Sequence, residues 1–274
     1  MSEGDQIART DRPITVDRLS DDLLALGVGP GDLLLVHSSL AALGWVNGGP
    51  AAVIQALLEA VGPAGTLVMP AHSPDLTDPA NWEAPPVPQA WHDTIRQTMP
   101  AYDARYTPTR GMGRVAELFR TRPGALRSNH PSTSFAALGP LAADITSQHE
   151  LTAPLGMASP LGALYERDAK VLLLGVDFDK CTALHLAEQF VWPNRPLVHE
   201  GAPILVDSTR QWVAFEVPPL MDSDHFLPIG AAALRLGLVT AGPLGQGRGM
   251  LMDMRAIVDH AAAIWTPKRR SARV

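Results

Sequence analysis

The sequence predicts an α/β fold in which a central, mostly parallel sheet is flanked by helices. Short apolar runs such as "DLLLV" and "KVLLLGV" have the length and composition of strands that are buried on both faces. Segments in which apolar residues recur with helical spacing alternate with these runs along the chain. A helix that connects two strands makes a βαβ unit, and the two strands of such a unit run parallel.

The composition indicates a folded protein that does not span a membrane. Hydrophobic residues make up 46% and charged residues 18% of the 274 residues, which excludes a disordered chain and suffices for a sizeable core. No apolar stretch reaches membrane-spanning length, and the polar N-terminus lacks the apolar segment of a signal peptide. The single cysteine, Cys181, excludes an intrachain disulfide. We therefore expect a cytoplasmic protein with no membrane partner.

The charge pattern argues against nucleic-acid binding. The net charge is −6, and the only basic run is the short tail "PKRRSARV". An acidic protein attracts cations through its overall electrostatic field, so the net negative charge mildly favours a cationic ligand.

The first strands and helices follow one another without long gaps. Thr15 is placed as the N-cap of the first helix and Gly27 as its stop, and Pro50 lies near the start of the second helix. The predicted elements are a helix at 15–28, a strand at 31–40, a helix at 49–62 and a strand at 65–71.

A proline-rich loop at roughly 70–90 is too long for a simple connection and is a candidate functional loop. Beyond it, the sequence predicts a helix at 111–122, a strand at 133–139, a helix at 159–168, a central parallel strand at 170–176 and an antiparallel hairpin at 202–220 that turns at Asp207 and Ser208. Two helices close the chain around the glycine-rich segment 241–249. We expect a flexible N-terminus at 1–14, a single domain at 15–267 and a basic tail at 268–274.

Polar side chains gather where the predicted parallel strands end. His37, Ser38 and Ser39 lie at the carboxyl end of the first strand, and His72, Ser73 and Asp75 follow the second. The segment "GVDFDKCTALH" contains the third such turn, at the end of the strand at 170–176. In open α/β sheets ligands bind outside the carboxyl ends of the strands, so these turns are expected to converge on one crevice. Each has a simpler interpretation as well, because serines before a helix often serve as caps.

The segment "DKCTALHLAEQ" places His185 and Glu188 three residues apart on one face of a predicted helix. Such a pair can bind a metal, act as a catalytic base with its partner, or form a hydrogen bond in the core. The second histidine of known zinc helices is missing, so we predict no metal site. The sequence also lacks the G-x-S-x-G and G-x-x-x-x-G-K-[ST] motifs, and "GQGRG" lacks the spacing of a dinucleotide loop.

Four blocks of the chain, in this order and spacing, resemble the aminoglycoside 3-N-acetyltransferases. The blocks are "VHSSLAALGWVNGG", "AVGPAGTLVMPAHSPDLTDP", "TRGMGRVAELFRTRPGALRSNHPSTSFAALGP" and "KVLLLGVDFDKCTALHLAEQ". The resemblance runs from about residue 15 to the end and is strongest up to about residue 195. It implies transfer of an acetyl group from acetyl-CoA to the 3-amino group of a 2-deoxystreptamine aminoglycoside, an antibiotic-resistance reaction.

The resemblance also implies roles for individual residues. His185 matches the catalytic histidine, and an imidazole suits the removal of a proton from an ammonium group at neutral pH. "PLMDSDHF" resembles the late acidic block of the family, which makes Asp224 the first choice as partner of His185 and assigns Asp222 to the cationic substrate. Glu188 competes for the partner role because residues three apart share a helix face.

The remaining site residues are expected to bind the two substrates. Asp75 is the further acid expected to meet amino groups of the acceptor. The residues expected to contact acetyl-CoA are His37, Ser38, Ser39, Arg110, Arg127, Ser128, His130, Ser134 and Phe135.

The last third of the chain, from about residue 196, is expected to shape the acceptor pocket, and it matches the resistance enzymes poorly. Three alternatives therefore stay open: an N-acetyltransferase acting on another amine, a hydrolase that uses the same histidine and acid, and a catalytically silent protein that binds CoA or an aminoglycoside. The sequence is compatible with a monomer or a homodimer.

Overall fold

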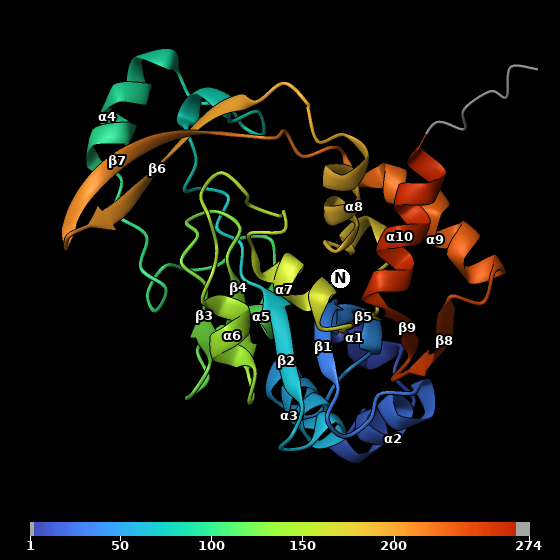
Figure 1. Ribbon diagram of the computed structural model, residues 1–274. Coiled ribbons are helices and arrows are strands. Elements are labelled where there is room, and N and C mark those ends of the chain that lie inside the picture. Colours follow the sequence, from blue (N-terminus) through green and yellow to red (C-terminus); the bar gives the residue numbers. More distant parts are fainter. Residues whose placement is uncertain (1–2, 267–274) are drawn as a thin grey trace, which may run out of the picture.

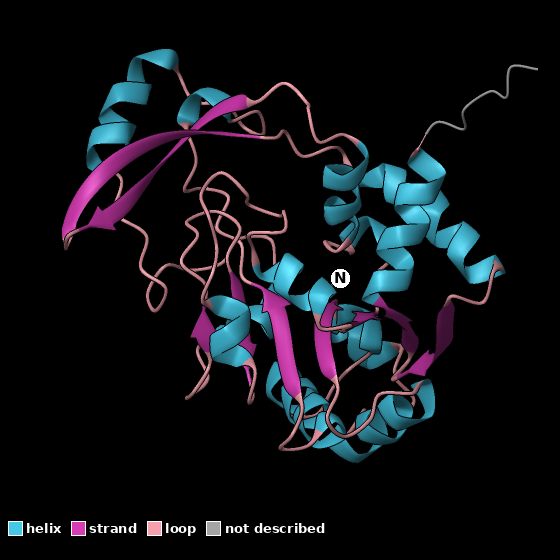
Figure 2. Cartoon of the chain, viewed as in Figure 1, coloured by secondary structure: helices cyan, strands magenta, loops and turns pink. Residues whose placement is uncertain are grey.

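The computed structural model describes residues 3–266 and has an α/β architecture (Figures 1 and 2). The strands are β1 (Leu33–Ser38), β2 (Thr66–Pro70), β3 (Leu126–Arg127), β4 (Phe135–Leu138), β5 (Lys170–Leu174), β6 (Val198–Val206), β7 (Thr209–Val217), β8 (Val239–Leu244) and β9 (Gly247–Asp253). The α-helices are α1 (Glu3–Ala8), α2 (Val16–Leu26), α3 (Gly49–Val61), α4 (His92–Thr98), α5 (Gly113–Arg120), α6 (Ala142–Thr146), α7 (Pro160–Glu166), α8 (Leu184–Val191), α9 (Phe226–Arg235) and α10 (Met254–Trp265).

Within the described residues, seven strands form the main sheet in the order β3-β4-β2-β1-β5-β9-β8. The three central strands run parallel, and Leu35 of β1 lies opposite both Val68 of β2 and Val171 of β5. The flanking pairs β2–β4, β3–β4, β5–β9 and β8–β9 are antiparallel. The predicted fold class is confirmed at the centre of the sheet, and the strands on either side of the three central ones run antiparallel.

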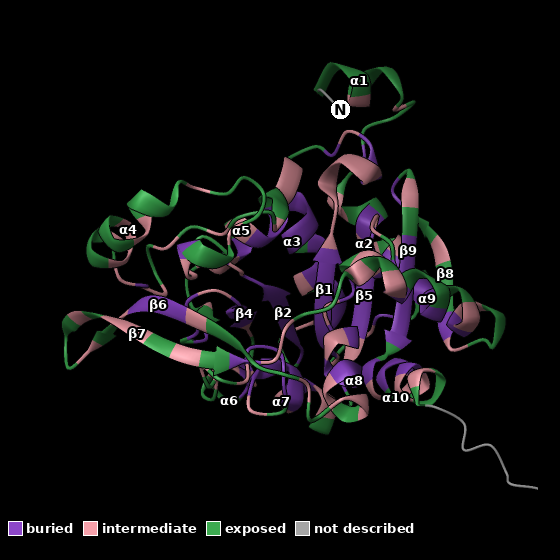
Figure 3. Cartoon of the chain, turned by 90° about the horizontal axis from the view of Figure 1, so that it is seen from above, coloured by how far each residue is buried: buried purple, intermediate pink, exposed green. Residues whose placement is uncertain are grey.

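Helices cover both faces of this sheet because the central strands are apolar on both sides. Leu34 and Val36 pack in the cluster that includes α2, α3 and α5, whereas Leu33 and Leu35 pack in the cluster that includes α7, α8, α9 and α10. This alternation is the two-residue period of a strand. Figure 3 shows the central strands as the buried middle of the molecule. His37 follows Leu33 and Leu35 on the same side of β1, which is the side of α8.

The helix predicted at 15–28 is α2, and it begins and ends where its capping residues predict. The Thr15 side chain accepts a hydrogen bond from the backbone N–H of Arg18, which satisfies one free donor of the first turn. Gly27 has a φ of 106°, in the left-handed region that glycine adopts without steric cost, and it ends α2.

The glycine-rich segment 241–249 forms much of the β8–β9 hairpin, whereas the sequence predicted only the two helices around it and no strand within it. A Cβ on Gly247 would lie 2.6 Å from the carbonyl oxygen of Ala42, and one on Gly249 would lie 2.8 Å from Leu26. These glycines therefore allow close packing of a strand against its neighbours. The two closing helices, α9 and α10, are present on either side of the hairpin.

The predicted antiparallel hairpin is confirmed as the separate sheet β6–β7. Asp207 and Ser208 form its two-residue turn, and both have positive φ angles. The hairpin lies alongside α4, away from the main sheet (Figure 1). The backbone N–H of Tyr102 donates to the carbonyl of Pro203, and Arg210 Nε donates to the carbonyl of Met99. These bonds tie the hairpin to the segment that follows the proline-rich loop.

Part of the N-terminal segment 1–14, predicted to be flexible, is ordered into α1, and Ile14 is fully buried in a bridge to Val46. The basic tail predicted at 268–274 lies outside the described residues. No helix within residues 3–266 has both the length and the apolar character needed to cross a bilayer.

Candidate active site

A cleft of about 660 Å³ opens at the carboxyl ends of the three parallel strands. Its wall includes residues at or just beyond the end of each of these strands: His37, Ser38 and Ser39 for β1, Pro70 and His72 for β2, and Val176 for β5. The polar turns predicted to converge on one crevice therefore do so. The order of the central strands brings them together, because parallel neighbours end at the same edge.

His185 enters this cleft from the first turn of α8. Its side chain is 12% exposed and lines the cavity, and its ring meets Phe226 edge-on at 4.8 Å between centroids. One turn later, Glu188 is fully buried, and its Oε1 lies 3.1 Å from His185 Nδ1. When Nδ1 donates this hydrogen bond, the neutral ring has its lone pair on Nε2. The arrangement is that of a base with an orienting acid.

Two further side chains approach Glu188. Arg195 Nη1 lies 3.4 Å from Oε2, and His225 Nε2 lies 3.4 Å from Oε1. Sequence reasoning missed both residues. Arg195 comes after the end of α8, where helical spacing no longer indicates which residues meet, and His225 stands in the late acidic block without a pattern of its own.

The other two histidines of the cleft are held neutral. Burial, together with a smaller effect of the nearby His185, lowers the pKa of His37 to about 3. Burial also lowers the pKa of His72 to about 3, with smaller effects of His37 and His185. Among the cleft residues that the structure describes, His185 is the histidine with a carboxylate partner, so it is the candidate base.

The acids from the late block lie at the surface. Asp224 is exposed, and its backbone N–H donates to the Asp222 carboxylate at 3.1 Å. No contact between Asp224 and His185 is found within the described residues, and Glu188 occupies the partner position. Asp222 is exposed between Leu220 and Ser223, both of which line the cleft. It therefore lies at the rim.

Asp75 and Arg110, expected to bind different substrates, form an ion pair with each other on the surface. Arg110 also donates its backbone N–H to the carbonyl of His72 at 3.0 Å. Neither side chain is in the wall of the cleft.

The "RSNHPSTSF" block lies behind the cleft, and none of its residues lines the cavity. The half-buried Arg127 donates to the carbonyls of Thr107 and Ala71 and to the hydroxyls of Ser73 and Ser134. Ser128 accepts from the backbone N–H of Phe135, whose buried ring meets His72 edge-on at 5.3 Å between centroids. Buried polar groups need such partners. In the structure this block connects loop backbones and supports His72.

His130 and His149 lie against each other in this block, with ring centroids 4.5 Å apart and ring planes tilted by 33°. His130 Nδ1 accepts the backbone N–H of Thr133, and His149 Nε2 lies 2.8 Å from the carbonyl oxygen of Pro154. Burial lowers the pKa of His130 to about 4 and that of His149 to about 3, the latter with a contribution from His130. Both rings are neutral in the folded protein near neutral pH.

The protein should lose stability as the pH falls below about 6.5. The unfolded chain binds protons at these histidines below that pH, whereas the folded protein does so only near pH 3 to 4. Each histidine can therefore remove up to about 1.4 kcal/mol per pH unit across this window. Urea unfolding should show a smaller loss between pH 7 and pH 5 for His149→Gln than for wild type. His199→Gln, which removes an exposed imidazole, should match wild type, and equal losses in all three proteins would contradict the assignment.

The turn after the third parallel strand also contributes to the cleft, as predicted. Asp179, Lys180 and Thr182 of this turn line the cavity, and Asp179 pairs with Lys180 at 2.7 Å. Met112 lines it as well and was not predicted, because nothing local in the sequence indicates that it faces a ligand. No group of three or more His, Cys, Asp or Glu side chains placed to hold a metal ion is found between residues 3 and 266.

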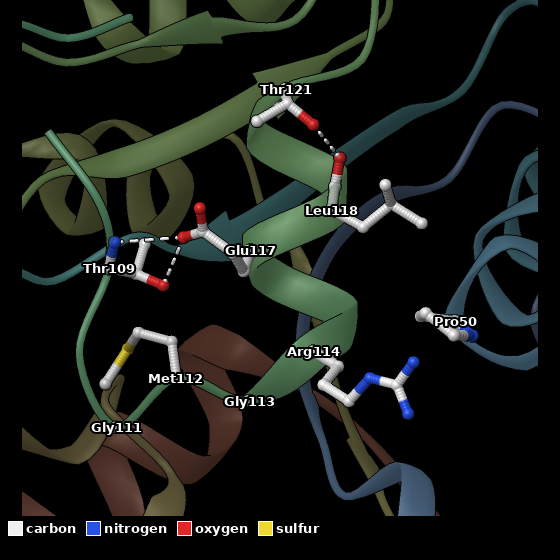
Figure 4. A pocket seen from close by; sticks show the side chains of 9 residues that line it. All are labelled: Pro50, Thr109, Gly111, Met112, Gly113, Arg114, Glu117, Leu118 and Thr121. Atoms are coloured by element: carbon white, nitrogen blue, oxygen red, sulfur yellow. Dashed lines mark hydrogen bonds between the residues drawn. The ribbon is translucent and has the colours of Figure 1, made fainter. Parts of the chain in front are cut away.

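A second cavity of about 540 Å³ adjoins the cleft (Figure 4). The two share a wall at Gly111, Met112, Gly113 and Arg114, where α5 begins. Glu117 accepts hydrogen bonds from the backbone and the side chain of Thr109 on one side of this cavity, and Arg114 extends toward Pro50 on another. Arg114 is exposed, and the structure gives it no partner among the described residues.

Comparison with known proteins identifies one family. The model of the family "Aminoglycoside 3-N-acetyltransferase" matches residues 35–266. The SPbeta prophage-derived aminoglycoside N(3')-acetyltransferase-like protein YokD of Bacillus subtilis is 45% identical over 256 residues, which cover 93% of each chain. Aminoglycoside N(3)-acetyltransferase VII of Streptomyces paromomycinus is 37% identical over 96% of this chain and 95% of its own.

Solved structures agree with this result. The crystal structure of YokD superposes with a TM-score of 0.93 at 43% identity, covering 96% of this chain and 97% of that chain. AAC-IIIb in a binary complex with CoASH has a TM-score of 0.80 at 32% identity, over 92% and 96% of the chains. AAC-VIa bound to sisomicin has a TM-score of 0.82 at 31% identity, over 92% and 97%.

Proposed function

The chain belongs to the aminoglycoside 3-N-acetyltransferases, and we propose that it moves an acetyl group from acetyl-CoA to the 3-amino group of a 2-deoxystreptamine aminoglycoside, with His185 as general base. One observation carries the assignment of the base: the His185 ring lines the cleft at the strand ends while its Nδ1 is bound to the buried Glu188. The names of the CoASH-bound and sisomicin-bound relatives support the two substrates.

The chemistry requires a base because an aminoglycoside amine is an ammonium at neutral pH and has no lone pair for attack. His185 Nε2 takes a proton from this nitrogen, and the freed amine attacks the carbonyl carbon of the thioester. The new C–N bond forms and the C–S bond breaks. His185 passes its proton to the departing thiolate, and the attacking nitrogen releases its second proton to solvent as it becomes a neutral amide. Glu188 holds the ring in the Nδ1–H tautomer and stabilises the imidazolium that forms, as the acid of a catalytic triad does.

The two adjoining cavities offer room for acetyl-CoA. We place the thioester in the cleft beside His185, near the turn at Ser38 and Ser39, because the reacting carbon must lie within reach of the base. The pantetheine chain then passes along the shared wall at Gly111–Arg114 into the second cavity (Figure 4). There the guanidinium of Arg114 is available to a phosphate, a group that arginine binds well. Ser38, Ser39 and Arg114 are therefore the proposed cofactor contacts.

The acceptor is proposed to bind from the open side of the cleft. Asp179 lines the cavity and Asp222 lies at its rim, so both can meet amino groups of a polycation. Asp75 is less suited to this role because it does not line the cavity and pairs with Arg110 outside it. These acids are exposed or partly exposed, and salt weakens interactions between exposed charges. The acceptor KM should therefore rise with ionic strength.

A thiol-release assay with acetyl-CoA tests the function. Release should require an aminoglycoside whose 3-amino group is free, and a matched compound that is N-acylated at this position should give only the background rate. Release with other amines but not with aminoglycosides would assign a different acceptor, and release without any amine would indicate a hydrolase. Binding of both ligands without release would indicate a silent binding protein.

A further inference from the structure

The buried Glu188 carboxylate has more neighbours than an orienting role requires. Its Oε1 serves His185 Nδ1 at 3.1 Å and lies 3.4 Å from His225 Nε2, and its Oε2 lies 3.4 Å from Arg195 Nη1. Glu188 is fully buried, and the Arg195 side chain is 13% exposed. In the described part of the chain, Arg195 Nε and Nη2 are buried without hydrogen-bond partners, and its ionic partner there is Glu188.

A buried carboxylate needs a nearby positive charge, because an uncompensated charge in the interior is costly. Three side chains can supply it: Arg195, or His185 or His225 in the protonated form. An arginine is charged at every physiological pH, whereas a histidine must take up a proton. The arginine therefore satisfies the requirement without using the proton site of the base.

From this geometry we infer that Arg195 is a positioning residue that acts through Glu188 and keeps His185 unprotonated in the resting enzyme. The inference rests on the proposed role of His185 as the base. With Arg195 present, the charges of Glu188 and Arg195 balance each other, so the cluster needs no proton on His185 or His225. Without it, the balanced state is reached when one of the two histidines takes up a proton. A protonated His185 cannot accept the proton of the substrate.

The other groups around His185 do not replace this charge. His37 and His72 face it across the cleft, and burial lowers their pKa values to about 3, so both are neutral at working pH. His225 stands on the 3₁₀-helix Ser223–His225 and contacts Phe226 and Trp265 through its ring. It reaches the same carboxylate oxygen as His185, so its protonation would compete with His185 for Glu188.

The test is the pH profile of kcat/KM for the acceptor in Arg195→Gln, in Arg195→Lys and in a control, Arg255→Gln. Arg255 is an arginine paired with Asp168 on the surface, away from the cleft. In Arg195→Gln the acidic limb of the profile should move to higher pH by about one unit, the effect expected from loss of one nearby charge. The plateau at high pH should stay close to that of wild type, because the base is then free. Arg195→Lys and Arg255→Gln should both keep the wild-type limb.

NMR titration of the His185 ring in the same proteins, without substrates, gives a readout that does not depend on turnover. The midpoint should move upward in Arg195→Gln and stay in place in Arg195→Lys. If neither the acidic limb of kcat/KM nor the NMR midpoint of His185 moves in Arg195→Gln, the inference is overturned. If Arg195→Gln fails to fold, a shift of the limb or the midpoint in Arg195→Lys would overturn it as well. Should His185 prove not to be the base, the midpoint would still move while the kinetic limb would not, so the two failures are distinguishable.

Discussion

His185→Ala should lower kcat by about 100-fold or more, the usual size of a lost general base. The ring is the proposed base, and alanine leaves no atom that can take the proton. Acetyl-CoA affinity should remain nearly unchanged, because the proposed contacts of the cofactor are at Ser38, Ser39 and Arg114. Stopped-flow or steady-state thiol release gives kcat, and calorimetry gives the affinity.

Near-normal turnover in a folded His185→Ala variant would show that His185 is not the general base. Loss of acetyl-CoA binding in step with kcat would instead place the ring against the cofactor. His199→Ala, which deletes an exposed imidazole on the hairpin, is the matched control and should retain full turnover.

Glu188→Gln should reduce kcat by about 100-fold or more, because an amide can hold the ring but cannot stabilise its positive charge, as in triads whose acid is replaced by its amide. The protein should also lose stability, since breaking a buried ion pair leaves Arg195 uncompensated, at a cost of about 3–5 kcal/mol. Kinetics and urea unfolding measure the two effects separately.

Asp224→Asn is the control for the orienting acid. It removes an exposed carboxylate that has no described contact with His185, so kcat should change by less than about two-fold, as for a surface substitution. If Asp224→Asn lowers kcat strongly and Glu188→Gln does not, the orienting role belongs to Asp224, as the resemblance of the late acidic block suggested.

Local patterns explain why part of the site could be predicted. His185 and Glu188 meet because residues three apart share a helix face, and the strand-end turns meet because parallel strands end together. The pairing of His185 with Asp224 depended instead on how distant loops fold, and the structure brings Glu188 to the ring while Asp224 remains exposed. Nothing local in the sequence places Arg195 beside Glu188.

Other residues were assigned to ligand binding because their side chains suit it, but in the folded protein these side chains form hydrogen bonds with other parts of the chain. Arg127 is a half-buried cation whose donors bind carbonyls and hydroxyls of neighbouring loops, and a sequence does not distinguish such an arginine from a phosphate ligand. The role of a glycine is equally hard to predict from the sequence alone. The sequence predicted no strand at 241–249, but Gly247 and Gly249 lie in β9, where neighbouring elements pack so closely that a larger side chain would not fit.

The position of the transferred acetyl group tests the central claim most directly. The protein is incubated with ¹³C-acetyl-CoA and a 2-deoxystreptamine aminoglycoside, and NMR of the product locates the labelled amide. Under the proposed mechanism the label is on the nitrogen at position 3, in a yield equal to the thiol released, and His185→Ala slows the formation of both by about 100-fold or more. Label on another nitrogen, or thiol release without labelled amide, would contradict it.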